Sequence, residues 1–331
     1  MTTSREIHLA ARPHGMPQPS DFALVEVDVP GLGDGEVLIR NAYMSVDPSM
    51  RARMNDVKSY VPSYEVGEVM SGGAVGQIVA SRNERLPEGT WVTSWLGWRE
   101  LALSDGTGLV PIDPALAPVS TALGVLGMPG LTAWVGLLDI GRPKEGETVY
   151  VSGAAGAVGS LVGQIAKLKG CRVIGSAGSS EKVAWLRELG FDEAFDYRET
   201  DPRQALKEGI DLYFDNVGGP TLEASLSALR RHGRVVACGA ISQYNATEPP
   251  PGPRNMSYVV TKRLRIEGFI VIDHFDRYPA FLAEVGPWVR DGSARYRETV
   301  LDGLEHAPEA LVGLLTGENI GKMLVKVGPD A

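Results

Sequence analysis

The stretch Thr148-Val149-Tyr150-Val151-Ser152-Gly153-Ala154-Ala155-Gly156-Ala157-Val158-Gly159 decides the fold of this chain. Its first four residues predict a short buried strand, and the small residues after them predict a tight turn. A helical pattern then runs from Val158 to Lys169 and ends before Gly170, a residue that suits the position after a helix. A strand, a glycine-rich turn and a helix in this order are typical of a dinucleotide-binding unit.

The turn itself carries a recognisable fingerprint. Ala154-x-Gly156-x-x-Gly159 matches the dinucleotide motif, with alanine in the first glycine position. Small side chains let the backbone approach a pyrophosphate, and the helix N-terminus offers it N–H groups and a partial positive charge. The alternative is an ordinary tight turn between a strand and a helix. The residues predicted to make this contact are Gly153, Gly156, Ala157, Val158 and Gly159.

The chain after this turn alternates between strands and helices. Further strands are predicted at 172–175, 212–214, 235–237 and 266–269, and a helix from Glu181 to Leu189, capped by Ser179 or Ser180. Such alternation predicts an α/β fold with a doubly wound parallel sheet.

The first hundred residues have a different pattern of secondary structure. Short strands broken by turn residues predict a small, mostly β domain, with strands near 24–29, 37–40, 76–80 and 90–93. The alternating run from Lys322 to Val327 suits that domain better than the parallel sheet. We therefore expect one domain from residues 1–125 and 296–331, and a nucleotide-binding domain from 126–295.

The end of the second strand predicts which nicotinamide coenzyme is bound. An NAD enzyme places an acidic residue there to bind the ribose hydroxyls, but this chain has Gly178, Ser179 and Ser180, with Lys182 one turn later. Hydroxyls and a lysine accept a 2′-phosphate, so NADPH is favoured. Tyr197 adds a possible hydroxyl donor. The alternatives are a solvated Lys182 and a Tyr197 packed in the core.

Seven short segments of the sequence resemble those of a known family. The chain resembles the zinc-independent medium-chain dehydrogenase/reductase superfamily, in the branch of leukotriene B4 12-hydroxydehydrogenase/prostaglandin reductases, plant double-bond reductases and bacterial curcumin and 2-alkenal reductases. The phrases that carry it fall in order along nearly the whole chain: 45–51 (SVDPSMR), 127–133 (GMPGLTA), 152–160 (SGAAGAVGS), 178–182 (GSSEK), 214–219 (FDNVGG), 239–245 (GAISQYN) and 318–322 (ENIGK).

This resemblance implies a GroES-like domain beside a Rossmann domain, and a homodimer. It implies contacts of Lys182 and Tyr197 with the 2′-phosphate of NADP(H). It also implies a substrate pocket lined by Tyr43 and Tyr244. The other coenzyme contacts that it implies, several beside the nicotinamide, are Met128, Thr132, Asn216, Cys238, Tyr244, Phe269, Val271 and Asn319.

The cysteine and histidine content bears on the chemistry. The chain has two cysteines, Cys171 and Cys238, and five histidines without ligand spacing, so we expect no zinc site. Alcohol oxidation commonly depends on zinc, whereas addition of hydride to the β-carbon of an enone needs only a hydrogen-bond donor for the enolate oxygen. We expect Tyr244 to be that donor, with Tyr43 as the second candidate; each has an alternative interpretation as a packing residue.

Some residues depart from the family pattern. Ser49 and Trp134 stand where many relatives carry tyrosine, and His274 lies in a variable part of the pocket. These departures affect the expected size of the substrate and leave the expected reaction unchanged. Arg51 and Arg53 are interpreted as solvated or phosphate-facing charges.

Composition excludes several classes of function. The net charge of −9 argues against partners that are nucleic acids or anionic membranes, and no apolar run is long enough to span a membrane. Two unpaired cysteines and the lack of a signal-peptide pattern predict the cytoplasm. Two alternatives to enone reduction stay open: an NADPH:quinone oxidoreductase, and a coenzyme-binding protein without turnover.

Overall fold

The computed structural model describes residues 2–330, and the chain divides into two compact units. The first unit comprises Met1–Gly124 and Glu298–Ala331, and the second comprises Val125–Arg297. The chain thus leaves the first unit once and returns to it for its last strands.

The second unit is built on a six-stranded parallel sheet with the order β10-β9-β8-β11-β12-β13. The order runs outward from β8 in one direction and from β11 in the other, which makes the sheet doubly wound. Ligands of such sheets bind beyond the carboxyl ends of the strands, where the order reverses. The strands are β8 (Thr148–Val151), β9 (Arg172–Ala177), β10 (Glu193–Asp196), β11 (Ile210–Asp215), β12 (Leu229–Ala237) and β13 (Arg265–Gly268).

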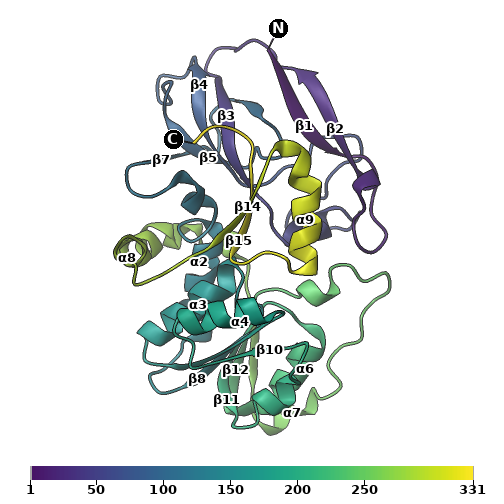
Figure 1. Cartoon of the computed structure of the whole chain (residues 1–331), viewed down its shortest axis with the longest axis vertical. Coiled ribbons are helices and arrows are strands. Elements are labelled where there is room, and N and C mark those ends of the chain that lie inside the picture. The colour runs from purple at the N-terminus through teal and green to yellow at the C-terminus, as the bar shows by residue number, and fades with distance from the viewer. Residues whose placement is uncertain (1, 331) are drawn as a thin grey trace. The chain divides into compact units, whose positions relative to one another are not determined.

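Helices cover this sheet, with α3 and α4 on one side of the strands and α6 and α7 on the other (Figure 1). Gly163 of α3 packs so closely on Phe191 that a β-carbon would lie 1.9 Å from the ring. The helical segments are α2 (Met128–Val135), the π-helix η3 (Gly136–Gly141), α3 (Ala157–Leu168), α4 (Ser180–Glu188), α5 (Pro202–Ala205), α6 (Gly219–Ala228), η4 (Ile241–Gln243), α7 (Ser257–Thr261), η5 (Val271–Arg277) and α8 (Tyr278–Asp291).

Strand residues alternate between the two faces of the sheet. Tyr150, Ile174, Tyr213 and Val235 belong to one buried cluster with Leu226 of α6. The rings of Tyr150 and Tyr213 stack with centroids 5.0 Å apart. Because β8 and β11 are buried along nearly their whole length, their sequences are mostly apolar, with Asp211 and Asp215 as the charged residues of β11.

The first unit is mostly β. Its seven-stranded sheet has the order β14-β15-β3-β4-β5-β7, with β6 on β3, and a separate pair joins β1 to β2. The strands β14 and β15, from the end of the chain, extend the sheet of β3, β4 and β5 (Figure 1). The strands are β1 (Thr3–Leu9), β2 (Phe22–Asp28), β3 (Val37–Ser45), β4 (Ala74–Ser81), β5 (Trp91–Ser94), β6 (Leu101–Ser104), β7 (Val110–Ile112), β14 (Glu298–Asp302) and β15 (Lys322–Lys326).

A core of apolar side chains fills the first unit. Trp98 is fully buried and stacks on Phe22 with ring centroids 6.3 Å apart. Met44, Met50 and Leu311 belong to the same cluster, so the core joins β3, α1 and α9. The helical segments of this unit are η1 (Pro19–Asp21), α1 (Ser49–Arg53), η2 (Val119–Leu123), η6 (Leu304–His306) and α9 (Ala307–Thr316).

The predicted fold class is confirmed: one unit is built on a doubly wound parallel sheet, and the other unit is mostly β. The strand predicted at 148–151 has those bounds, and the helix predicted from Val158 begins one residue earlier. The strand at the end of the chain pairs with β3, as expected. Among residues 2–330, the structure contains no helix of the length and apolarity that a membrane span requires.

Candidate functional site

The turn after β8 has the geometry of a pyrophosphate cradle. Gly153 adopts a φ of +57°, a conformation that favours glycine, and Gly156 caps α3 without a side-chain hydrogen bond. A β-carbon on Gly159 would lie 2.5 Å from the carbonyl oxygen of Gly153, so only glycine fits where helix and turn meet. No bulky side chain of this turn therefore covers the first N–H groups of α3, and such uncovered N–H groups suit an anionic ligand.

A second group of residues gathers at the carboxyl end of β9. Ser179 caps α4 by accepting a hydrogen bond from the Lys182 backbone N–H at 3.3 Å. Burial, and next the charge of Arg198, lowers the pKa of the Lys182 ammonium. Two cations held close together repel each other unless an anion joins them, so this group fits a phosphate.

Tyr197 completes this group. Its hydroxyl lies 2.9 Å from where a β-carbon of Gly178 would stand, and the guanidinium of Arg198 lies 5.9 Å from its ring centroid. Tyr197 is 49% exposed, so the alternative interpretation as a core residue is wrong. The structure therefore brings together Gly178, Lys182 and Tyr197, which the sequence predicted.

Arg198 also belongs to this group, although it was not predicted from the sequence. Its signal was modest: a basic residue directly after Tyr197, following the next strand of the sheet. The register places β10 beside β9, with Asp196 opposite Ala177, so the residues after both strands meet at one edge.

The ends of β8, β11 and β12 meet at the switch point of the sheet. The side-chain amide of Asn216 donates to the Ser152 carbonyl oxygen at 2.8 Å. Burial, and next the charge of Asp215, raises the pKa of the Cys238 thiol to about 12, so Cys238 stays a thiol at neutral pH. Asn216 and Cys238 thus lie at the edge where a ligand is expected.

Tyr244 follows the short helix η4, just beyond the end of β12. Its hydroxyl oxygen accepts a hydrogen bond from the Ala240 backbone N–H at 3.2 Å. The same oxygen would lie 3.2 Å from a β-carbon on Gly239. The phenol is therefore held against the loop at the carboxyl edge.

The segments predicted beside the nicotinamide adjoin one another. Met128 begins α2 and accepts a hydrogen bond from the Thr132 hydroxyl at 2.8 Å. At Gly136, directly after α2, a β-carbon would lie 2.7 Å from the ring of Phe269. Val271, two residues after Phe269, begins η5, so the structure brings the two predicted segments together.

Trp134 and His274, the two residues of this unit that depart from the family pattern, lie in different surroundings. Trp134 is 5% exposed, and its indole N–H donates to Glu284 at 2.7 Å. Trp134 therefore packs against α8, and it is a structural residue. His274 packs edge-on against Phe269, with centroids 6.3 Å apart, beside a predicted nicotinamide contact.

Tyr43 and Asn319 belong to the first unit. The Tyr43 hydroxyl donates to the carboxylate of Asp330, which also pairs with Lys326 at 2.7 Å. Burial and this carboxylate raise the pKa of Tyr43. Asn319 is buried, and its amide donates to the Gly321 carbonyl oxygen at 2.7 Å.

The expectation for Arg51 and Arg53 is wrong. Arg51 is 2% exposed and donates to the Gly15 carbonyl oxygen at 2.8 Å. Arg53 lies over the ring of Tyr64 at 4.0 Å and donates to its hydroxyl. Both guanidinium groups tie loops to α1, and neither is a solvated charge.

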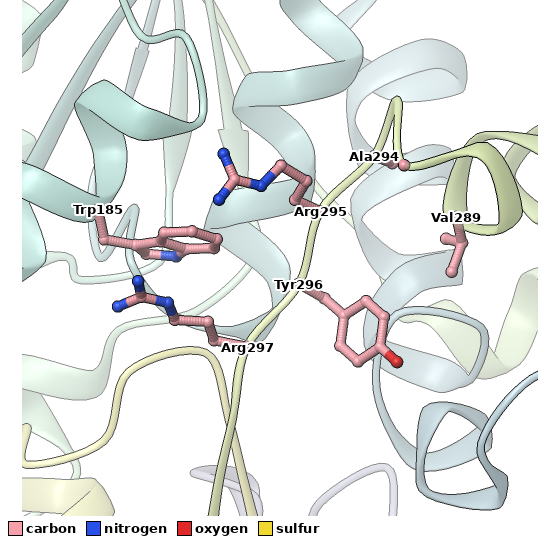
Figure 2. Close-up of a pocket in the computed structure, with 7 residues that line it drawn as sticks. Trp185, Val289, Ala294, Arg295, Tyr296 and Arg297 are labelled. Atoms are coloured by element: carbon pink, nitrogen blue, oxygen red, sulfur yellow. The ribbon is translucent and has the colours of Figure 1, made fainter.

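A pocket of about 290 Å³ lies at the end of the second unit, where none of the predicted coenzyme residues line it. Figure 2 shows Trp185 between the guanidinium groups of Arg295 and Arg297. The groups lie 5.1 and 4.1 Å from the ring, and both pair with Glu188. These contacts fasten the segment after α8 to α4, and the pocket is separate from the predicted coenzyme site.

Residues of the types that bind metal ions do not cluster in the described part of the chain. In the part of the chain from residue 2 to residue 330, no three His, Cys, Asp or Glu residues are grouped so as to hold a metal ion. The two cysteines are free thiols and do not pair with each other.

The doubly wound sheet, its glycine cradle and the cationic group beyond β9 define an oxidoreductase of the dinucleotide-binding class. Two family models match: one described as the N-terminal domain of oxidoreductase over residues 5–112, and one described as zinc-binding dehydrogenase over 157–286. The chain belongs to the zinc-independent medium-chain dehydrogenase/reductase family, in the branch of the prostaglandin, curcumin and 2-alkenal reductases. The resemblance seen in the sequence is thereby confirmed.

Relatives match along nearly the whole chain. The NADPH-dependent curcumin reductase of Escherichia coli (strain K12) is 47% identical, covering 97% of this chain and 96% of its own. Prostaglandin reductase 1 of Rattus norvegicus is also 47% identical, covering 94% and 95%. The crystal structure of CurA from Vibrio vulnificus in complex with NADPH superposes with a TM-score of 0.93 at 47% identity, covering 98% of this chain and 99% of that one.

Proposed function

We propose that this protein uses NADPH to reduce the α,β-carbon–carbon double bond of enals and enones. The observation that carries the proposal is similarity along nearly the whole chain to enzymes named for NADPH-dependent curcumin reduction and for prostaglandin reduction. The arrangement of Lys182, Tyr197 and Arg198 supports the choice of coenzyme, because these groups suit a 2′-phosphate.

We assign the coenzyme contacts to three groups of residues. The pyrophosphate would lie on Gly153, Gly156, Ala157, Val158 and Gly159, and the 2′-phosphate on Gly178, Ser179, Lys182, Tyr197 and Arg198. The nicotinamide half would contact Met128, Thr132, Asn216, Cys238, Tyr244, Phe269, Val271 and Asn319. The close approach at Gly159 and the positive φ of Gly153 support the first group most directly.

Bound NADPH supplies a hydride, and its addition to the β-carbon of an enone moves negative charge onto the carbonyl oxygen. We assign to Tyr244 the hydrogen bond that stabilises this oxygen. A phenol O–H can donate a hydrogen bond, and the Ala240 N–H holds its oxygen in place. Tyr43 is the second candidate, although its hydroxyl would first have to leave Asp330. Solvent would supply the proton to the α-carbon.

We further propose a homodimer in the cytoplasm. Among residues 2–330, strand β13 pairs only with β12, so its other edge offers unpaired backbone groups. Ile266 on this strand is 39% exposed, and Val260 before it is 78% exposed. Two copies of β13 could pair across a twofold axis and cover these apolar side chains. A molar mass in solution near twice 35.4 kDa would support the dimer, and a monomer would contradict it.

The reaction is tested by following NADPH oxidation at 340 nm with trans-2-nonenal, an enone and 1,4-benzoquinone, each repeated with NADH. We expect turnover of the enal and the enone with NADPH, and little with NADH. Oxidation of NADPH by the quinone alone would favour a quinone oxidoreductase. A thermal shift with NADPH without any turnover would favour a coenzyme-binding protein.

A further inference from the structure

We infer that Asp215 is a positioning residue, whose buried carboxylate fixes the two loops that carry Asn216 and Tyr244. The inference rests on the proposed function only where it assigns those two residues to coenzyme and substrate. Asp215 ends β11, and it is 2% exposed. No role for a charged residue was expected at this position from the sequence.

Three donors converge on one oxygen of this carboxylate. Oδ1 of Asp215 lies 2.6 Å from the Tyr213 hydroxyl, 3.0 Å from the Val217 N–H and 2.7 Å from the Gly218 N–H. A carboxylate only accepts hydrogen bonds, and bonds to a charged acceptor are stronger than neutral ones. The charge therefore holds the turn after β11 in a single conformation, in which Gly218 has a φ of +70°.

The backbone of the same turn holds the loop after β12. The Asp215 carbonyl oxygen accepts hydrogen bonds from the N–H groups of Cys238 at 2.9 Å and Gly239 at 3.0 Å. The Val217 carbonyl oxygen accepts from both the N–H and the hydroxyl of Ser242. The second loop leads directly to Tyr244, so displacement of the first turn would displace the phenol.

The network also reaches the end of β8. The Ser152 hydroxyl oxygen lies 2.9 Å from the Tyr213 hydroxyl and accepts a hydrogen bond from the Asn216 N–H at 3.2 Å. Asn216 in turn donates its side-chain amide to the Ser152 carbonyl oxygen. Asp215 thus sets the position of Asn216 relative to the start of the pyrophosphate turn.

A purely structural role would not require the charge. Burial raises the pKa of Asp215, and the titratable groups around it, Tyr213, Tyr150 and Cys238, offer no positive charge in compensation. A raised pKa in the folded state means that stability linked to Asp215 is present at low pH and is lost as the pH rises through that pKa. A neutral isostere would relieve this cost of burial while weakening the three bonds, so stability and activity should respond differently.

The test is Asp215→Asn, with Asp211→Asn as its matched control. Asp211 lies at the other end of β11, where its carboxylate accepts from the Thr148 N–H at 2.8 Å and from Arg230 at 2.6 Å. For Asp215→Asn we expect a Tm close to that of the wild type, a kcat lowered by about 10-fold to 100-fold, and faster amide exchange at 216–218 and 238–242. Asp211→Asn should keep the wild-type kcat.

Two results would overturn the inference. One is a wild-type kcat together with wild-type amide exchange in Asp215→Asn; the other is a loss of kcat that follows Tm equally in both variants. If Asp215→Asn does not fold, Tyr213→Phe removes one of the three bonds and should give a smaller loss of the same kind. If the wild type reduces no enal or enone, the proposed function fails, while amide exchange and the Kd for NADPH still decide the role of Asp215.

Discussion

The hydroxyl of Tyr197 lies 2.9 Å from the point where a β-carbon on Gly178 would stand. The ring therefore lies over residue 178, and any larger side chain there must push it away. Because Tyr197 is half-exposed, it can swing outward at little cost in stability. In Gly178→Ala we expect the KM for NADPH to rise about fivefold, the equivalent of one lost hydrogen bond, with a Tm near that of the wild type. Tyr197→Phe should raise the KM for NADPH as much as Gly178→Ala does. A wild-type KM for NADPH in both variants would show that Tyr197 does not contact the coenzyme.

Arg198 provides a test of coenzyme preference. Arg198→Gln should raise the KM for NADPH by roughly 10-fold or more, because a charge-assisted bond to phosphate contributes about 1.5–3 kcal/mol. The KM for NADH should not change, since NADH lacks the 2′-phosphate. Arg203→Gln is the control, because Arg203 is an exposed cation on α5 that pairs with Glu223 at 3.0 Å. Equal changes for the two coenzymes would contradict the assignment.

Lys182 predicts a pH dependence of binding. Burial and Arg198 lower its pKa in the protein without ligand, and a bound phosphate would raise that pKa again. Binding of 2′,5′-ADP should therefore take up a proton at alkaline pH, and its affinity should fall as the pH rises through the lowered pKa. Calorimetry between about pH 7 and 10 measures how steeply the affinity for 2′,5′-ADP falls with pH. Lys182→Arg stays charged over this range and should flatten the slope; identical slopes in the two proteins would refute the assignment.

Tyr244 should matter for the rate more than for binding. Tyr244→Phe removes the proposed donor to the carbonyl oxygen, so kcat for an enone should fall about 10-fold to 100-fold, with little change in the KM for NADPH. Tyr43→Phe is the comparison, because that hydroxyl is engaged by Asp330 and should contribute less. If Tyr43→Phe causes the larger loss of kcat, the roles of the two tyrosines are reversed.

Substitution by alanine should have opposite effects on stability at two glycines that lie in helices. A β-carbon at residue 159 meets the backbone of Gly153 at 2.5 Å, so Gly159→Ala should destabilise the protein by about 1–3 kcal/mol and abolish the thermal shift with NADPH. Gly286, inside α8, has nothing within 4 Å of its β-carbon position. Gly286→Ala should therefore stabilise the protein, by up to about 1 kcal/mol. Unfolding with and without NADPH measures both.

Features of the fold that depend on local sequence could be predicted. Gly153, Gly156 and Gly159 predict the turn because the backbone there excludes side chains, whatever lies further away. The strand at 148–151 is a continuous apolar run for the same local reason, and it was placed correctly. The helix α8 was not predicted, because Pro287 and Gly286 interrupt its helical pattern.

Features that depend on residues distant in sequence could not be predicted. Arg51 looks like a surface charge, yet its partner carbonyl belongs to Gly15, which no spacing rule connects to it. Trp134 replaces a tyrosine in the family pattern, but only its contact with Glu284 shows that its indole packs against α8. The charge of Asp215 and the proximity of Arg198 to Lys182 likewise became visible only when adjacent strands were placed side by side.

The contacts that hold residues 294–297 on α3 and α4 determine where the chain can be truncated to give the nucleotide-binding unit alone. Gln164 of α3 holds both the N–H and the carbonyl oxygen of Arg295, while Arg295 and Arg297 enclose Trp185. A fragment that stopped at the end of α8 would uncover this indole and lose the contacts that hold α3 and α4, the two helices that begin at the proposed phosphate sites. The smallest autonomous fragment therefore has to include Arg297, six residues beyond the last helical residue, Asp291.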